Sequence, residues 1–414
     1  MTGVQTCALP ISLSGTTNAL VEISAALASS NKQNAAEKIA ILEKQYRSFI
    51  IDLLKEEALR EKANKIISEH FEFLYITQKI SLSDALNKDI LAQGELMSTK
   101  LFSCYLEQQN IEHALLPALE FMQLDVNDEP DLMAIQTKIK DVLAPHLGKK
   151  LFITQGYICR NSKGEVDNLK RGGSDYTASL IAAAVKASVC EIWTDIDGMH
   201  NNDPRVVEKT VAIEQLSFDE AAELAYFGAK ILHPTCIWPA QQENIPVKLL
   251  NTMQPSAVGT VIKKEAGSVG VKAVAAKDAI TAIKIKSSRM LLAYGFLRKI
   301  FEVFEKFKTP IDMITTSEVA VSVTIDNDAH LDQIIEELNN IALVEVERNQ
   351  TIVSIVGNEI AKTEEVLNKL FQAINEIPVT MVSYGGSPHN ISLLIPSAYK
   401  IKTLQLINKG LFDL

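Results

Sequence analysis

The sequence has few cysteines, and they follow none of the patterns that would give them a structural task. Their number is odd and no two have Cys-x-x-Cys spacing, so neither a disulfide framework nor a zinc site is supported for Cys7, Cys104, Cys159, Cys190 and Cys236. A reduced, cytoplasmic compartment fits this usage best. A run of about eighteen uncharged apolar residues is also missing, which argues against a membrane-spanning helix.

Common nucleotide and catalytic signatures are missing too. The sequence has no GxxxxGK[ST] or GxGxxG segment, no protein-kinase HRD or DFG set, and no HExxH. Basic residues number 41 against 51 acidic ones, and the resulting net charge of −10 argues against a nucleic-acid partner. The 414 residues are too many for one compact core, which predicts two or three domains.

What is present is an α/β pattern. Residues 34–70 place apolar side chains at helical spacing among many charges, and strands alternate with helices after Leu151. This alternation predicts a layered sheet with helices on both faces. Helices are expected at 18–29, 71–80, 84–109, 175–187 and 218–229, and strands at 112–116, 120–125, 151–159, 190–195 and 245–251.

The last third of the chain contains a repeated pattern. Residues 256–276 are rich in small side chains and predict a linker. Beyond them, residues 280–346 and the segment from 351 onward each follow the order of a ferredoxin-like βαββαβ unit. The second copy lacks a final strand, and we expect an earlier segment near 269–275 to complete that sheet.

The segment RGGSDY (171–176) is the most informative candidate site. Its two glycines let a ligand approach the backbone, and Ser174 is a good cap for a helix whose free N–H groups would attract an anion. Arg171 adds a charge suited to carboxylate or phosphate, and Asp175 could orient a reacting group or hold magnesium. A glycine-rich turn that only caps a helix explains the segment equally well.

Weaker candidates lie at the ends of strands and helices. Thr194 and Asp195 end a buried strand, where ligands of open α/β sheets bind, and Arg205 follows in a loop from which it could reach phosphates. Lys230 ends a helix and Glu95 begins one. The alternatives are an Asp-Gly turn with a solvated arginine, and two charges that only complement helix dipoles.

The order of the motifs is more specific than any one of them. From the N-terminal side they are SGTTN (14–18), GELMS (94–98), TQGYI (154–158), RGGSDY (171–176), EIWTDIDG (191–198), DPR (203–205), ELAYFGAKILHP (223–234), NIPV (244–247), NT (251–252) and YGGSPHN (384–390). This series resembles the aspartokinase branch of the amino-acid kinase family over nearly the whole chain, from Ile11 to Leu414.

The resemblance implies a fold and a domain layout. We expect an α/β protein in which a three-layer α/β/α amino-acid kinase domain is followed by two ferredoxin-like βαββαβ ACT units. The expected boundaries are 11–263 for the kinase domain, 264–276 for the linker, 277–349 for the first ACT unit and 350–414 for the second. No homoserine dehydrogenase follows, so the implied enzyme has a single function.

The N-terminal residues depart from the family. The opening MTGVQTCALP resembles a translated sequencing-adapter read, so residues 1–10 are expected to be artefactual or disordered and outside the fold. The family's opening strand, KFGGTS, is absent. Its lysine stabilises the transferring phosphoryl group, so we expect the 414-residue chain to have little or no activity.

The resemblance also implies roles for matching positions in an aspartate kinase that makes ADP and 4-phospho-L-aspartate, the first step of lysine, threonine and methionine biosynthesis. Asp175 would be catalytic, and aspartate would contact Thr17, Glu95, Arg171 and Ser174. ATP, its phosphates bridged by Mg²⁺, would be held by Gly172, Gly173, Thr194, Asp195, Arg205 and Lys230. His200 replaces a tyrosine that the family commonly has near the nucleotide, which leaves the adenosine contact open.

The ACT units imply feedback inhibition and a homodimer that they hold together. Lysine is the expected effector and threonine the second choice. Asp312 would face its ammonium groups, and the pocket would be lined by Met290, Gly295, Phe296, Leu297, Thr316, Ser317 and Glu318. Two other functions stay open: another amino-acid kinase such as glutamate 5-kinase, and a non-catalytic amino-acid-sensing regulatory protein.

Overall fold

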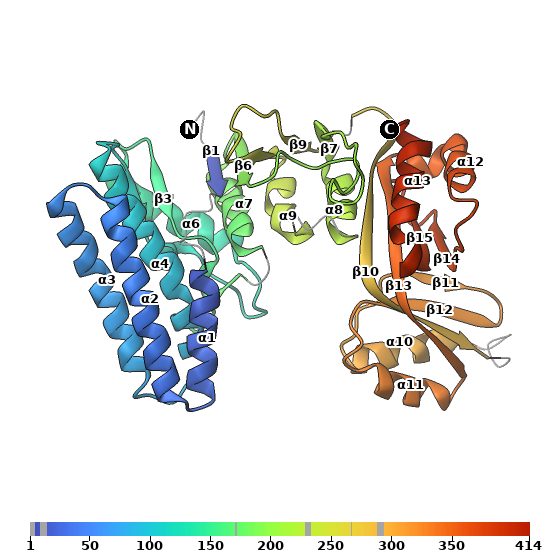
Figure 1. Ribbon diagram of the computed structural model, residues 1–414, viewed down its shortest axis with the longest axis horizontal. Helices are drawn as coiled ribbons and strands as arrows, with labels where there is room; N and C mark the ends of the chain where they lie inside the picture. The colour runs from blue at the N-terminus through green and yellow to red at the C-terminus, as the bar shows by residue number, and fades with distance from the viewer. Residues whose placement is uncertain (1–4, 9–14, 170–171, 228–232, 266, 288–293) are drawn as a thin grey trace. The chain divides into compact units, whose positions relative to one another are not determined.

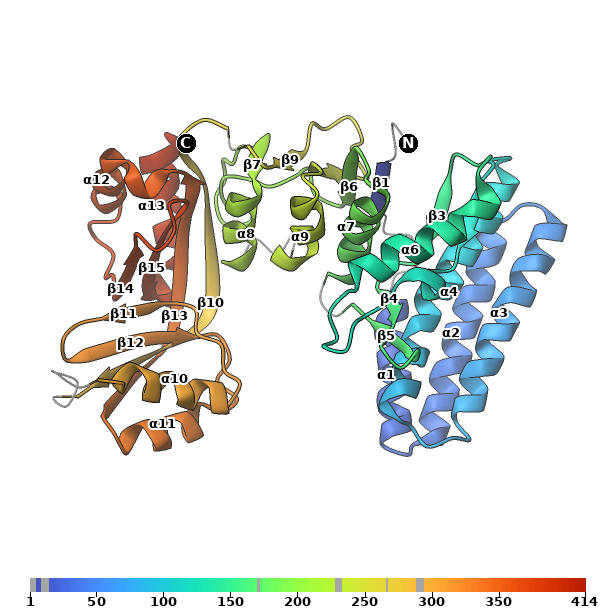
Figure 2. The same cartoon turned by 180° about the vertical axis from the view of Figure 1, so that it is seen from behind.

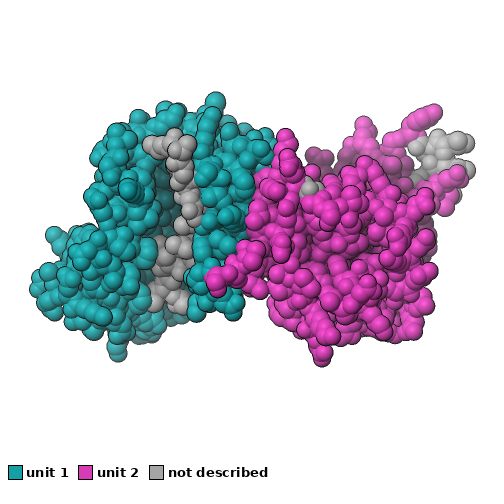
Figure 3. All heavy atoms as spheres, turned by 90° about the horizontal axis from the view of Figure 1, so that it is seen from above, with its two compact units in different colours: residues 1–195, 235–255 teal, residues 196–234, 256–414 magenta. Residues whose placement is uncertain are grey.

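The computed structural model describes residues 5–8, 15–169, 172–227, 233–265, 267–287 and 294–414. The chain divides into two compact units, which Figure 3 colours separately. Unit 1 comprises Met1–Asp195 and Thr235–Pro255, and unit 2 comprises Ile196–Pro234 and Ser256–Leu414. No helix among the described residues combines the length and apolar character that crossing a membrane requires.

Four helices pack side by side at the start of unit 1 (Figure 1): α1 Thr16–Ala28, α2 Lys32–Leu53, α3 Glu57–Thr77 and α4 Asp84–Gln108. Their common core contains fully buried Ile39, Tyr46 and Phe71. The helical pattern of residues 34–70 is thus split between α2 and α3, and α3 includes most of the separate helix expected at 71–80. The side chains of Asn31 and Ser83 cap α2 and α4, which fixes where these helices begin.

The rest of unit 1 is α/β. Strands β6 Val189–Thr194 and β8 Val247–Asn251 are parallel, with Cys190 opposite Val247. Two shorter pairs accompany them, β2 Ala114–Leu116 with β3 Phe152–Thr154, and β4 Ile158–Arg160 with β5 Val166–Asn168. The helices are α5 Ala118–Phe121, α6 Leu132–Leu143, the 3-10 turn η1 Ala144–His146, α7 Gly173–Val185 and α9 Pro234–Gln242.

Two strand predictions in unit 1 are wrong in detail. The strand expected at 120–125 is replaced at its start by α5, and only isolated bridges at Gln123 and Leu124 follow. The strand expected at 151–159 is broken into β3 and β4, because the backbone turns at Tyr157, whose φ is 68°. Residues 1–10 were expected to lie outside the fold, whereas the structure describes β1 Gln5–Ala8 as a parallel neighbour of β6.

Unit 2 contains a six-stranded sheet in the order β11-β12-β10-β13-β15-β14. Two long antiparallel strands form its centre (Figure 2), β10 Gly270–Lys286 and β13 Leu343–Asn358. The other strands are β11 Ile314–Thr316, β12 Ala320–Ile325, β14 Met381–Tyr384 and β15 Asn390–Pro396. The helices are α10 Phe296–Lys306, α11 Leu331–Asn339, α12 Glu364–Ala373 and α13 Lys400–Phe412, with the 3-10 turns η3 Ile360–Lys362 and η4 Ser397–Tyr399.

The first half of β10 explains why the second repeat lacks a strand of its own. Residues 270–277 pair with 352–358 of β13, so the expectation that a segment near 269–275 completes the second sheet is confirmed. The same pairing corrects the linker, because residues 270–276 are strand. Unit 2 also holds β7 Gln215–Ser217, which pairs with β9 Thr260–Lys263, and α8 Phe218–Tyr226.

Candidate active site

Four segments of unit 1 that carry sequence-predicted residues lie next to one another. They are the start of α1 with Thr17, the middle of α4 with Glu95, the turn 154–158, and the start of α7 with Ser174 and Asp175. We call them together the acceptor region. Its glycines and hydroxyl groups show how the segments are joined.

The start of α1 meets α4 at Gly94. A Cβ on this glycine would lie 3.2 Å from both the Thr16 methyl and a Leu20 methyl, so the small residue permits the close approach. Beneath this contact the Thr16 hydroxyl lies 3.1 Å from the hydroxyl of Tyr46, a fully buried side chain of α2 that also bonds Ser98. Tyr46 therefore joins the two segments, a link that helical spacing alone did not reveal.

The turn 154–158 meets the start of α7 at two glycines. A Cβ on Gly156 would lie 2.8 Å from Ser174 Oγ, and one on Gly173 would lie 2.5 Å from Tyr157 Cδ2. Tyr157 N–H donates to the Thr177 hydroxyl at 3.0 Å. Gly156 of TQGYI and Gly173 of RGGSDY are thus needed for this approach, beyond any helix-capping role.

Gln155 joins the same turn to α4. Its Nε2 donates to the Thr99 hydroxyl at 2.8 Å, its Oε1 accepts from Ala118 N–H at 2.8 Å, and its side chain is buried. Thr99 in turn donates to the Glu95 carbonyl at 2.9 Å. Gln155 therefore ties the turn to α4 one helical turn after Glu95, and although it lies in the TQGYI motif, no role was predicted for it.

Burial shapes the charges of the acceptor region. It raises the pKa of Asp175 to about 6, and it raises the pKa of Glu95 as well. Neither carboxyl group forms an ion pair with a described residue. A cationic ligand group or a metal-bound phosphate would relieve this unpaired negative charge. Thr17 and Ser174 are exposed beside them, and Arg171 lies outside the described residues.

The predicted nucleotide residues fall in both units. In unit 1, Thr194 ends β6 and donates to the Asp195 carboxylate at 3.1 Å, while its carbonyl accepts from Thr252 N–H at 2.8 Å. Gly172 has φ 65° and begins α7 without a side-chain cap, so the Ser174 side chain is not the cap that the sequence suggested. These residues lie at strand and helix ends, as expected for phosphate or ribose contacts.

In unit 2, Arg205 lies in the loop of residues 202–209, which we call the nucleotide loop. Its guanidinium forms a two-point contact with the Asp203 carboxylate at 2.9 and 2.8 Å, yet 85% of the side chain is exposed. His200 bonds Asp197 and Thr210 at 2.8 and 2.9 Å. Lys230 lies outside the described residues.

Comparisons with known proteins agree with this arrangement. The amino acid kinase family model matches residues 11–251, and an ACT domain model matches residues 353–411. The chain is 33% identical to the lysine-sensitive aspartokinase 3 of Escherichia coli (strain K12), over 96% of this chain and 91% of that protein. The chain belongs to the aspartokinase branch of the amino acid kinase family.

Solved structures of aspartokinases show the same fold. E. coli aspartokinase III in complex with aspartate and ADP has a TM-score of 0.82 at 31% identity, covering 98% of this chain and 93% of that chain. Its complex with lysine and aspartate has a TM-score of 0.78 at 31% identity, covering 97% and 91%. The expected fold class and the expected enzyme, an aspartate kinase, are thereby confirmed.

In this aspartokinase chain, the residue expected to face an effector is already engaged. The side chain of Asp312 is 2% exposed, and its Oδ1 accepts from Lys277 Nζ at 2.7 Å and from the Tyr226 hydroxyl at 2.9 Å. The other oxygen, Oδ2, is buried without a described partner. Lys277 also pairs with Asp326 at 2.9 Å and lies over the Tyr226 ring.

The other predicted effector residues vary in their exposure. Gly295 has φ 79° at the start of α10, and Phe296 is buried in the core that α10 and α11 share with the sheet. Leu297 is partly exposed, and Thr316, Ser317 and Glu318 form an exposed turn between β11 and β12. Met290 lies outside the described residues.

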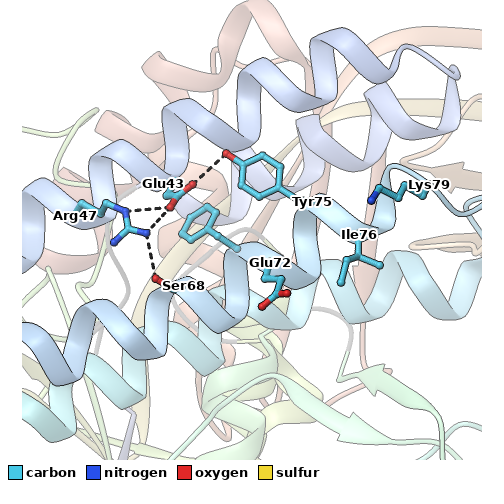
Figure 4. A pocket seen from close by; sticks show the side chains of 8 residues that line it. Glu43, Arg47, Ser68, Glu72, Tyr75, Ile76 and Lys79 are labelled. Atoms are coloured by element: carbon cyan, nitrogen blue, oxygen red, sulfur yellow. Dashed lines mark hydrogen bonds and ion pairs between the residues drawn. The ribbon is translucent and has the colours of Figure 1, made fainter.

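A separate pocket of about 450 Å³ lies between α2 and α3 of the helical bundle (Figure 4). Arg47 and Glu43 pair along α2 at 2.5 Å, while Arg47 donates to Ser68 of α3 and Tyr75 of α3 donates to Glu43. Its walls include none of the residues predicted from the sequence. Because Glu43 and Arg47 pair with each other, the pocket offers no unpaired charge from these two residues to a ligand.

Proposed function

We propose that this chain transfers the γ-phosphoryl group of ATP to the side-chain carboxylate of L-aspartate. The observation that supports the proposal is the acceptor region, where four motif-bearing segments are joined by direct contacts and carry two carboxyl groups whose pKa values burial raises. The E. coli relative has been solved with aspartate and ADP, the acceptor and the spent donor of this reaction.

In the proposed reaction an aspartate carboxylate oxygen attacks the γ-phosphorus, and the bond to the β,γ-bridging oxygen breaks. ADP leaves with the electron pair, and 4-phospho-L-aspartate is formed.

The residues of the acceptor region would position the substrate for this step. Glu95 would pair with the ammonium of the substrate, Arg171 with its α-carboxylate, and Thr17 and Ser174 would fix its orientation. Asp175 would organise the charges around the transferring group, because positioning and charge neutralisation dominate this chemistry.

The nucleotide would be held by Gly172, Gly173, Thr194, Asp195, Arg205 and Lys230. Within the described residues there is no group of three or more acidic, histidine or cysteine side chains that could hold a metal. Mg²⁺ is usually bound by one or two carboxylates together with substrate phosphates, and Asp175 fits that requirement. The ion would neutralise phosphate charge when bound.

The test is an ADP-release assay with aspartate or glutamate as acceptor. It is run on the 414-residue chain and on a version in which a KFGGTS strand precedes Ile11. We expect the completed version to use aspartate with a preference of at least about a hundredfold, and the 414-residue chain to bind aspartate but turn over slowly. Equal use of glutamate, or no ADP release by the completed version, would contradict the proposal.

We further propose that lysine binds the first ACT unit at Asp312 and inhibits the kinase. Support comes from the buried, half-satisfied carboxylate of Asp312 and from the E. coli structure solved with lysine and aspartate. Inhibition requires that lysine bind an inactive arrangement more tightly than the active one. Calorimetry with lysine and with threonine tests the effector, and an absence of heat with both would remove it.

Three broader proposals accompany these. The reaction would be the first step in the biosynthesis of lysine, threonine and methionine. The ACT units would hold a homodimer together, and sedimentation at two protein concentrations tests this proposal. A reduced cytoplasm would suit Cys104, Cys159, Cys190 and Cys236, which are buried thiols. Fluorescent tagging in the source cell tests the compartment.

A further inference from the structure

The nucleotide loop is closed at its base by a side chain from the last helix of the chain. Asn408 of α13 accepts hydrogen bonds at its Oδ1 from the side-chain amides of Asn201 and Asn202, each at 3.3 Å. Its Nδ2 donates to the Lys209 carbonyl at 3.0 Å. One amide therefore bonds both ends of the loop that carries Arg205.

These amides lie in the interior of unit 2. Asn201, Asn202 and Asn408 are only 4%, 3% and 1% exposed. Asn201 also accepts from Val211 N–H at its Oδ1, and Asn202 donates to the Leu404 carbonyl of α13. Buried amides are costly unless they are paired, so this set favours one arrangement of the loop base over others.

An apolar contact attaches the same loop to the same part of the fold. Val207 is 7% exposed and belongs to a core cluster with Leu404 and Ile407 of α13 and with the strands of the second repeat. Arg205 lies two residues before Val207 and remains exposed. The loop is thus anchored by an apolar side chain and an amide, while its charged side chain is left available to a ligand.

We propose that Asn408 is a positioning residue for nucleotide binding, which acts by holding the loop of Asp203 and Arg205 on α13. The inference rests on the proposed role of Arg205 in holding ATP. It assigns to the C-terminal ACT unit a structural part in the nucleotide site, in addition to any effector site. Removal of the amide breaks bonds at both ends of the loop and leaves only Val207 and the Asn202–Leu404 bond among the contacts described above, so the backbone that carries Arg205 becomes less firmly held.

The test is calorimetric binding of Mg-ADP and of aspartate to the 414-residue chain and its N408A variant. We expect ADP to bind about tenfold more weakly in N408A, with aspartate affinity within about twofold of the unmodified chain. The matched control is T403V, since Thr403 is equally buried in α13 but its hydroxyl donates to the carbonyl of Tyr399, the residue before α13, and not to the loop. T403V should leave ADP affinity unchanged.

A second variant separates a positioning role from a loss of stability. N202A removes the bonds that Asn202 donates to Asn408 and to the Leu404 carbonyl without altering α13, while Asn201 and Lys209 keep their bonds to Asn408. It should therefore reproduce part of the selective loss of ADP binding, and the double variant should lose less binding free energy than the sum of the two single losses. If N408A and N202A bound ADP as tightly as T403V and the unmodified chain, the inference about Asn408 would be wrong, while the proposed role of Arg205 would stand. A failure of the unmodified chain to bind ADP would overturn the proposed nucleotide role as well.

Discussion

The acceptor region and the nucleotide loop hold their proposed ligand-binding residues by different means. In the acceptor region every tie comes from the same unit: Tyr46 joins α1 to α4, Gln155 joins the turn 154–158 to α4, and Gly156 lets that turn approach α7. The nucleotide loop is also held from within its own unit, but by α13 of the second repeat, through Asn408 and the packing of Val207.

The difference has a consequence for regulation. A change in the ACT units can reach the nucleotide loop through α13, because both lie within unit 2, whereas the ties described for the acceptor region all lie within unit 1. An effector would then alter nucleotide binding before aspartate binding. Coupling between an effector and the nucleotide loop requires two arrangements of unit 2 that the effector binds with different affinities. The variants below test whether the acceptor region and the nucleotide loop respond separately.

The largest effect is expected from Asp175→Asn, which removes the buried carboxylate of the acceptor region. In the version with a KFGGTS strand, kcat should fall about a hundred- to a thousandfold. Activity of the unsubstituted protein should fall as the pH drops through the Asp175 pKa of about 6, because protonation removes the charge. A kcat–pH profile checks both statements, and an unchanged profile in Asp175→Asn would assign the titration elsewhere.

The raised pKa of Asp175 also predicts how stability depends on pH. The charged Asp175 carboxylate should lower the free energy of unfolding, whereas an ion-paired aspartate would raise it. Its pKa is higher in the folded protein than the unperturbed value of 3.8, so the charged form destabilises the fold above about pH 6. Asp175→Asn should therefore stabilise the protein by up to about 2 kcal/mol at pH 7.5, and the gain should vanish near pH 4. Urea unfolding at the two pH values provides the measurement.

The next largest effect is expected from Gly156→Ala. The new methyl group would meet Ser174 Cα at 3.0 Å, a backbone atom that cannot rotate away, so the start of α7 must shift. Aspartate affinity should fall about a hundredfold and the free energy of unfolding by about 1–3 kcal/mol. Gly148→Ala is the control, since its methyl group would meet no atom within 4 Å. Lysine binding should be unchanged in both variants, and a loss in Gly156→Ala would break the proposed separation of the two regions.

The sequence predicted the elements of both regions but few of the ties between them. The spacing of apolar residues and the positions of glycines were enough to predict α7, β6 and the completion of the second sheet by residues 270–277. The sequence predicted only that Tyr46 is a core residue. Helical spacing predicts burial, but it does not predict that the Tyr46 hydroxyl bonds the Thr16 hydroxyl. Asn408 lies about two hundred residues from its partners in the loop, a separation at which local pattern carries no information.

Two features that the sequence did not reveal share a cause. The break between β3 and β4 coincides with the left-handed conformation of Tyr157, which packs against Gly173 at the start of α7. The contacts of Asp312 with Lys277 and Tyr226 are the second feature, while its contact with an effector stays a prediction. In both cases tertiary contacts from distant segments decide the outcome, and those contacts are invisible in one sequence.

A smaller effect is expected from Tyr46→Phe, which removes the hydroxyl that joins Thr16 to α4. Aspartate affinity should fall about fivefold, while ADP affinity stays within about twofold, because loss of one buried hydrogen bond loosens the acceptor region alone. Tyr75→Phe is the matched control, since its hydroxyl bonds Glu43 on the outside of the bundle. Equal loss of ADP and aspartate binding would point to a general destabilisation in place of positioning.

The smallest effect is expected from Lys277→Met, which should make lysine bind more tightly. The Lys277 ammonium occupies the Asp312 oxygen that an effector ammonium would need, so its removal leaves a buried carboxylate without its strongest partner. Lysine affinity should rise about threefold by calorimetry. Lys284→Met, on the same strand but paired with Glu347 at 2.6 Å, should leave it unchanged. If lysine bound Lys277→Met no better than Lys284→Met, the ion pair would be a structural feature of unit 2, and the path from effector to nucleotide loop would have to start at another residue.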